Sequence, residues 1–221
     1  MAGGVGSPPL GLLARLPRTA EGALVRSERV RLLAEIALTI ALCTVLKLWR
    51  IQLPWNFAGG DISLAMLPIL VLALRRGVFA AAVAGAAFGI IDFFFEPYAA
   101  APIQVLLDYP VAFALLAVAG FGSAHYRALA SSGRRLAAEA VAVPWMILGA
   151  AARFSAHFVS GIVFFGSNAP AGTPIWVYSA LYNLSYVVPS LILSVVAALL
   201  VLPVLDAAVP LASHGVRRAS S

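Results

Sequence analysis

The sequence predicts an all-α integral membrane protein with six transmembrane helices, from its composition, its long apolar segments and the placement of its basic residues. Hydrophobic residues make up 62% of the 221 residues, and charged residues make up only 11%. Soluble domains carry about 25% charged residues, so this chain has too few for a soluble surface. Segments of about 20 apolar residues cross a bilayer as a helix, because its hydrocarbon core is about 30 Å thick.

Six apolar segments follow one another along the chain, and we expect them to be its membrane helices. They run over residues 30–49, 62–74, 78–95, 103–121, 140–165 and 175–205. One membrane domain is therefore predicted over residues 29–206. It is flanked by a disordered cytoplasmic tail over 1–28 and a second cytoplasmic tail over 207–221.

The connections between the segments predict the orientation. One alternating set is basic and contains Arg26, Arg29 and Arg31, then Arg75 and Arg76, then Arg127, Arg134 and Arg135, then Arg217 and Arg218. The other set, 51–61, 96–102 and 166–174, contains no Lys or Arg. Cytoplasmic loops are enriched in Lys and Arg, so we expect both termini in the cytoplasm. The net charge of +6 then reflects contact with the lipid bilayer and not with nucleic acid.

Polar side chains on three segments converge at one depth of the predicted membrane. At a rise of about 1.5 Å per residue, Asp108 lies about 9 Å and His157 about 12 Å from the outer ends of their segments. Tyr178 and Asn183 lie about 6 and 14 Å inside the last segment. Ionisable groups cost about 2.5–3.5 kcal/mol each in a bilayer, so they indicate a function. A pocket of this kind suits a flat, cationic, hydrogen-bonding ligand from outside.

Structural interpretations of the same residues remain as alternatives. Asp108 and Arg153 would form an ion pair, and His157 would be a helix-packing residue. The tyrosines of the last segment would form an interfacial belt, and Arg153 would extend towards the interface. Asp92 and Glu96 lie near the outer end of the third segment, where we expect them to be solvated.

The connection 51–61 contains turn residues and the glycine pair Gly59-Gly60, which permits sharp bends of the backbone. It is expected either to cover the pocket as a lid or to be a plain connector. In the first segment, Ala37 and Ala41 have the small-residue spacing at which another helix can approach closely. Cys43 lies in the same segment and is expected to pack as a small apolar residue.

Four sequence motifs resemble those of one known family. They are LPILVLALRRG at 67–77, LDYPVAF at 107–113, HFVSGIVFF at 157–165 and YSALYN at 178–183. In their order and spacing, over about residues 29–202, they resemble the thiamine-specific S component (substrate-binding subunit) of energy-coupling factor (ECF) transporters. This resemblance implies a six-helix S-component fold with both termini inside, in the plasma membrane of a prokaryote. It also implies high-affinity capture of thiamine from outside, and docking on an ECF transmembrane coupling protein with two ATPase subunits.

The resemblance also implies which residues bind the ligand and the partner. The ligand-binding positions would be Asp108, Tyr109, His157, Phe165, Tyr178, Asn183, Tyr98 and Trp55. Ala37 and Ala41 would face the coupling protein. The chain departs from the family pattern at Phe165 and Gly59, where a characterised member has Trp, and at Asp108, where that member has Glu. We expect Trp55 to replace the missing loop tryptophan.

Other functions are compatible with parts of this pattern. A thiamine precursor such as hydroxymethylpyrimidine, or another vitamin, would use the same pocket. A membrane enzyme would use Asp108 and His157 as an acid–base or metal pair, but the sequence has no H-E-x-x-H motif and no nucleophile elbow. A purely structural subunit would bind no ligand. We therefore expect a binding subunit without a catalytic residue, metal or cofactor of its own. Its partner subunits would hydrolyse the ATP that drives transport.

Overall fold

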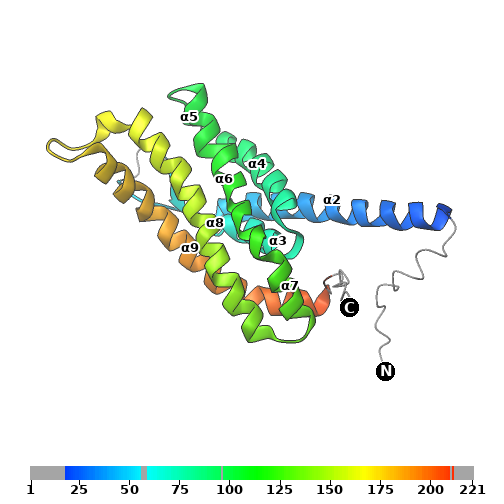
Figure 1. Cartoon of the computed structure of the whole chain (residues 1–221). Helices are drawn as coiled ribbons and strands as arrows, with labels where there is room; N and C mark the ends of the chain where they lie inside the picture. The colour runs from blue at the N-terminus through cyan, green and yellow to red at the C-terminus, as the bar shows by residue number, and fades with distance from the viewer. Residues whose placement is uncertain (1–17, 56–58, 96, 210, 212–221) are drawn as a thin grey trace, which may run out of the picture.

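The computed structural model in Figure 1 describes residues 18–55, 59–95, 97–209 and 211, and every structural statement below concerns these residues. Glu96 and most of the two predicted tails lie outside them. The long helices are α2 (Arg18–Leu48), α3 (Met66–Arg76), α4 (Val78–Phe95), α8 (Arg135–Phe164) and α9 (Ile175–Ala208). A further helical rod, Pro102–Ser131, lies between α4 and α8. Each of the six predicted segments thus contains one helical body.

Four of these helices are long and apolar enough to cross a membrane. Among the described residues they are α4, the rod Pro102–Ser131, α8 and α9. The chain is therefore a multi-pass membrane protein. Helix α3 differs because its 11 residues rise only about 16 Å, roughly half of the hydrocarbon thickness. The prediction of six complete transmembrane helices thus stays a prediction for α2 and α3.

The predicted boundaries differ from the structure at several helix ends, among them the starts of the first two segments. Helix α2 begins at Arg18, so residues 18–28 are helical and not part of a disordered tail as predicted. The second segment was expected to begin at residue 62, but Asp61–Ile62 form strand β2, which pairs with strand β1 (Ile51–Gln52). Helix α3 starts only at Met66 and ends at Arg76, and the next residue is Gly77, whose φ of 86° suits a residue without a side chain.

Helix α2 packs one stripe of side chains against α3 and α4 and leaves the opposite stripe open. The buried stripe contains Ile36, Thr39, Cys43 and Lys47, spaced three or four residues apart as one helix face requires. Cys43 is fully buried, as predicted. Ala37 and Ala41 lie on the exposed side of the helix. Figure 1 shows the N-terminal half of α2 extending beyond the rest of the bundle.

The rod Pro102–Ser131 is continuous but irregular. It consists of α5 (Pro102–Leu106), the π-helical segment η1 (Leu107–Val111), α6 (Ala112–Leu115), the 3-10 segment η2 (Leu116–Gly122) and α7 (Ser123–Ser131). Segment η1 contains Pro110, which has no backbone N–H to donate within the helix. Helix α4 approaches this segment closely through Gly89, where a Cβ atom would lie 2.5 Å from the carbonyl oxygen of Tyr109.

Ion pairs join the helices at the end of the bundle where α3 stops. Arg75 pairs with Asp206 of α9, and Asp206 also accepts a hydrogen bond of 2.6 Å from Tyr126 of α7. Arg76 donates two hydrogen bonds of 2.5 Å to Glu35 of α2. Helix α3 is short, but these contacts connect it to three other helices. The cavity described below lies towards the opposite end of the bundle, between α8, α9 and the rod.

Candidate functional site

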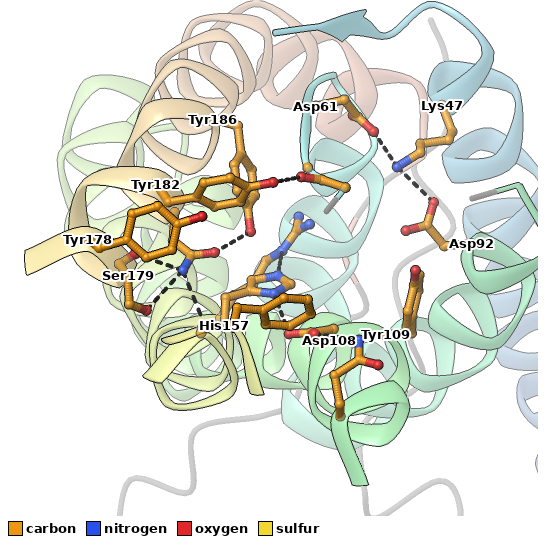
Figure 2. A pocket seen from close by; sticks show the side chains of 17 residues that line it. Lys47, Asp61, Asp92, Asp108, Tyr109, His157, Tyr178, Ser179, Tyr182 and Tyr186 are labelled. Atoms are coloured by element: carbon orange, nitrogen blue, oxygen red, sulfur yellow. Dashed lines mark hydrogen bonds and ion pairs between the residues drawn. The ribbon is translucent and has the colours of Figure 1, made fainter. Parts of the chain in front are cut away.

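A polar cavity lies between the start of the rod Pro102–Ser131, the second half of α8 and the first half of α9. It comprises about 720 Å³, part of which is open to solvent. The cavity is lined by Lys47, Gly59, Gly60, Asp61, Asp92, Gln104, Asp108, Tyr109, Arg153, His157, Gly161, Phe165, Tyr178, Ser179, Tyr182, Asn183 and Tyr186. Figure 2 shows these side chains from close by.

Asp108 has three hydrogen-bond donors around its carboxylate. Its Oδ2 accepts from Gln104 Nε2 at 2.7 Å and from Ser160 Oγ at 2.8 Å, and its Oδ1 faces His157 Nδ1 at 3.1 Å. Gln104 is itself oriented, because its Oε1 accepts from the backbone N–H of Ala100 at 2.9 Å. Asp108 lies in the π-helical segment, and such irregular turns are frequent at functional sites.

His157 connects Asp108 to Arg153. Arg153 Nε donates to His157 Nε2 at 3.2 Å, so this ring nitrogen carries no proton and Nδ1–H donates to Asp108. The guanidinium of Arg153 also lies over the ring of Phe113, 4.0 Å from its centroid. In the alternative interpretation Asp108 and Arg153 form an ion pair, but the two side chains do not pair directly, since the neutral imidazole of His157 lies between them.

Helix α9 contributes an aromatic and amide wall. Asn183 Nδ2 donates to the backbone oxygen of Ser179 at 2.8 Å and to that of His157 at 3.3 Å, while its Oδ1 accepts from Tyr186 at 2.6 Å. Tyr182 donates to the backbone oxygen of Gly59 at 2.8 Å. This last bond joins the first outer connection to the cavity wall.

A buried charge cluster on the opposite side of the cavity in Figure 2 was missed by the sequence analysis. Lys47 Nζ lies 2.5 Å from Asp61 Oδ2 and 2.9 Å from Asp92 Oδ1. The side chains of Lys47, Asp61 and Asp92 are only 6%, 3% and 7% exposed. The expectation that Asp92 is solvated is therefore wrong, because it faces an ammonium from α2 inside the protein. The available signal was the position of Lys47 on the same helix face as Cys43, which was predicted to be packed.

The ionisable residues around the cavity leave one negative charge in excess. Three carboxylates, those of Asp61, Asp92 and Asp108, face the two cations Lys47 and Arg153, and the His157 ring is neutral. Charges in a poorly solvated cavity interact more strongly than charges in water. The site therefore suits a ligand with one positive charge.

Six of the eight ligand-binding residues implied by the resemblance line this cavity. They are Asp108, Tyr109, His157, Phe165, Tyr178 and Asn183. Tyr98 is not in the lining but lies next to it, with its ring 5.4 Å from that of Phe165 and its backbone N–H 3.3 Å from the Tyr109 hydroxyl. Trp55 is also outside the lining and is 56% exposed. The first outer connection was expected either to cover the pocket as a lid or to be a plain connector, and its residues 56–58 lie outside the described part of the chain.

A multi-pass helical bundle with a polar cavity near one end has the architecture of a membrane transport protein. The chain belongs to the thiamine transporter protein family (Thia_YuaJ), whose model matches residues 33–209. This is a family of transporters and not of enzymes, which argues against the membrane-enzyme alternative for Asp108 and His157.

Two curated relatives and one solved structure resemble the chain. The thiamine transporter ThiT of Bacillus subtilis is 36% identical over 169 residues, which are 76% of this chain and 88% of the relative. That of Lacticaseibacillus paracasei is 34% identical over 140 residues, which are 62% of this chain and 70% of the relative. A structure of ThiT from Listeria monocytogenes matches with a TM-score of 0.68 and 29% identity, over 83% of this chain and 97% of the other.

Proposed function

We propose that the chain is the high-affinity thiamine-binding subunit of an ECF-type uptake transporter in a prokaryotic plasma membrane, with both termini in the cytoplasm. The observation that carries this proposal is the cavity, which combines one excess negative charge with aromatic side chains and oriented hydrogen-bonding groups. Thiamine has the matching chemistry, because it joins a cationic thiazolium ring to an aminopyrimidine. Membership of the thiamine transporter family supports the same ligand.

In this proposal Asp108 and the α9 residues orient the ligand. The carboxylate of Asp108 is held rigidly by Gln104 and Ser160, so it offers its remaining acceptor capacity in a fixed direction. The ring of Tyr178 and that of Phe165 provide aromatic faces, and a cation over such a face gains about 0.5–2 kcal/mol. Because the Asp108 carboxylate is already held in place before the ligand arrives, little side-chain conformational freedom is lost there when thiamine binds.

Transport itself would need partners. We propose that the chain docks through α2 on an ECF transmembrane coupling protein, whose two ATPase subunits hydrolyse ATP. Ala37 and Ala41 are exposed on α2 and have the spacing that allows a second helix to pack closely. The binding subunit would present the ligand and would catalyse no reaction.

The test is equilibrium dialysis of the purified chain against radiolabelled thiamine, followed by competition with its pyrimidine and thiazole halves. A radiolabel is preferable to tryptophan fluorescence, because no Trp lines the cavity within the described residues. We expect saturable binding at submicromolar thiamine and weak competition by either half. The absence of saturable binding at micromolar thiamine would contradict the proposal. Stronger binding of hydroxymethylpyrimidine than of thiamine would assign the chain to a precursor instead.

A further inference from the structure

The buried amide of Gln104 joins the second outer connection to the ligand cavity. Gln104 lies in α5 and is only 1% exposed. Its Oε1 accepts a hydrogen bond of 2.9 Å from the backbone N–H of Ala100, and its Nε2 donates one of 2.7 Å to Asp108 Oδ2. An N–H group requires an oxygen as its partner, and a carboxylate requires a donor. Both neighbours therefore dictate the same orientation of the amide, which cannot turn over without losing both bonds.

The described part of the second outer connection, residues 97–101, is fixed to side chains of the binding site. The backbone N–H of Tyr98 donates to the hydroxyl of Tyr109 at 3.3 Å, and the Tyr98 ring lies 5.4 Å from that of Phe165. Tyr109 and Phe165 both line the cavity. The bond to Gln104 is the shorter of the two backbone hydrogen bonds, and its acceptor is buried. Gln104 therefore holds this connection against the site.

The carboxylate of Asp108 has little acceptor capacity left for a ligand. A carboxylate oxygen offers about two acceptor positions. Those of Oδ2 are taken by Gln104 and Ser160, whereas Oδ1 faces one donor, His157 Nδ1. One position remains on Oδ1, so the carboxylate can receive one further donor. Its usefulness depends on how the whole group is turned, and Gln104 is one of the groups that determine this.

We infer that Gln104 is the positioning residue through which the second outer connection holds Asp108 in its ligand-binding orientation. This inference rests on the proposed function, because the affinity for thiamine reports that orientation. Gln104 acts through Asp108 and is assigned no contact with the ligand. Removing its amide releases both the carboxylate and the backbone N–H of Ala100. Removing the hydroxyl of Ser160 releases the carboxylate alone.

The test is a double-mutant cycle on the full-length chain, with the dissociation constant of radiolabelled thiamine measured by equilibrium dialysis. Gln104→Met keeps the length of the side chain and removes both polar atoms. We expect it to weaken binding about tenfold in the wild-type background. In an Asp108→Ala background the same change should alter the affinity less than about twofold, because residues that act as one unit are not additive. Asp108→Ala alone should bind about 100-fold more weakly than wild type, which dialysis still measures.

Hydrogen exchange of the amides of residues 97–101, measured by mass spectrometry without ligand, supplies the second readout. Exchange should be faster in Gln104→Met, because the Ala100 N–H loses its buried acceptor. Ser160→Ala is the matched control. It removes the other donor to the same carboxylate oxygen, so it should weaken thiamine binding and leave exchange at 97–101 unchanged.

Three results would overturn the inference. Gln104→Met might bind thiamine as tightly as wild type, or it might lose the same factor with and without Asp108, which would mean that Gln104 acts on the ligand by itself. Unchanged exchange at 97–101 in Gln104→Met would show that the amide does not hold the connection. Failure of the proposed function differs from all three, because the wild-type chain would then bind no thiamine, while the exchange comparison would still decide the role of Gln104.

Discussion

His157 Nδ1 lies 3.1 Å from Asp108 Oδ1, and this hydrogen bond joins α8 to the π-helical segment of the neighbouring rod. Since His157 Nε2 accepts from Arg153, the proton that Asp108 receives is fixed on Nδ1. The three groups therefore form a chain in one direction, from the guanidinium through the imidazole to the carboxylate. A change at either end is expected to alter the orientation of the others.

Asp108→Asn should lower thiamine affinity about 100-fold. All three neighbours of this side chain donate hydrogen bonds, so an amide N–H₂ would face a donor. Gln104 cannot reverse its own amide without losing its bond to Ala100. Equilibrium dialysis measures the dissociation constant. Asp108→Glu is the control, because it keeps both acceptors and should remain within about tenfold of wild type; equal losses in the two variants would refute this account of Asp108.

Gly161→Ala should weaken binding and lower stability together. A Cβ atom at Gly161 would lie 2.2 Å from Ser179 Oγ and 3.3 Å from Asn183 Nδ2, so the Ser179 side chain must leave its place in the cavity wall or α8 and α9 must separate. Overpacking of this kind costs about 1–3 kcal/mol. Thermal unfolding in detergent and ligand dialysis measure the two effects. Val159→Ile adds one methylene at an exposed position of α8 and should change neither quantity.

Asp206→Ala should lower the stability of the chain without changing the affinity of its folded fraction for thiamine. The variant leaves the buried guanidinium of Arg75 without its ion partner and removes the acceptor of Tyr126. Breaking a buried ion pair costs about 3–5 kcal/mol. Thermal unfolding is again the measurement. Arg31→Ala disrupts the partly exposed pair with Glu35 and should cost less than about 1 kcal/mol. If Asp206→Ala and Arg31→Ala lost similar amounts of stability, the buried Arg75–Asp206 pair would not contribute more than the partly exposed Arg31–Glu35 pair, contrary to this account.

Ala41→Trp should abolish thiamine uptake by cells that contain the coupling module, while the purified variant binds thiamine normally. The bulky side chain would prevent close approach of a partner helix to α2 but would not reach the cavity. Uptake of radiolabelled thiamine and equilibrium dialysis separate the two activities. Val196→Trp, on the exposed face of α9, is the control and should transport normally. Normal uptake by Ala41→Trp would exclude this face of α2 as the docking surface.

The long apolar segments and the converging polar residues were predictable from the sequence. Helix α4 has the predicted bounds, and α9 begins at the predicted residue, because apolar length and a flanking proline mark them clearly. Asp108, His157 and Asn183 meet at one cavity, as depth along the helices indicated. The length of an apolar segment and the depth of a residue within it depend only on nearby residues, so they can be inferred from a single sequence.

The buried cluster and the short strands were not predictable in the same way. Lys47 lies near the end of the first predicted segment, and nothing local to it shows that Asp61 and Asp92 will lie beside it. These contacts depend on the packing of α2 against α4 and on the pairing of β1 with β2. Similarly, Trp55 is near the cavity residues in sequence but is exposed in the structure.

The most direct test of the central claim is an experimental structure of the chain at saturating thiamine. The account predicts one thiamine molecule in the cavity between the rod Pro102–Ser131, α8 and α9, hydrogen-bonded to Asp108. Thiamine bound at any other place, or a cavity that remains empty while thiamine saturates the protein, would contradict it.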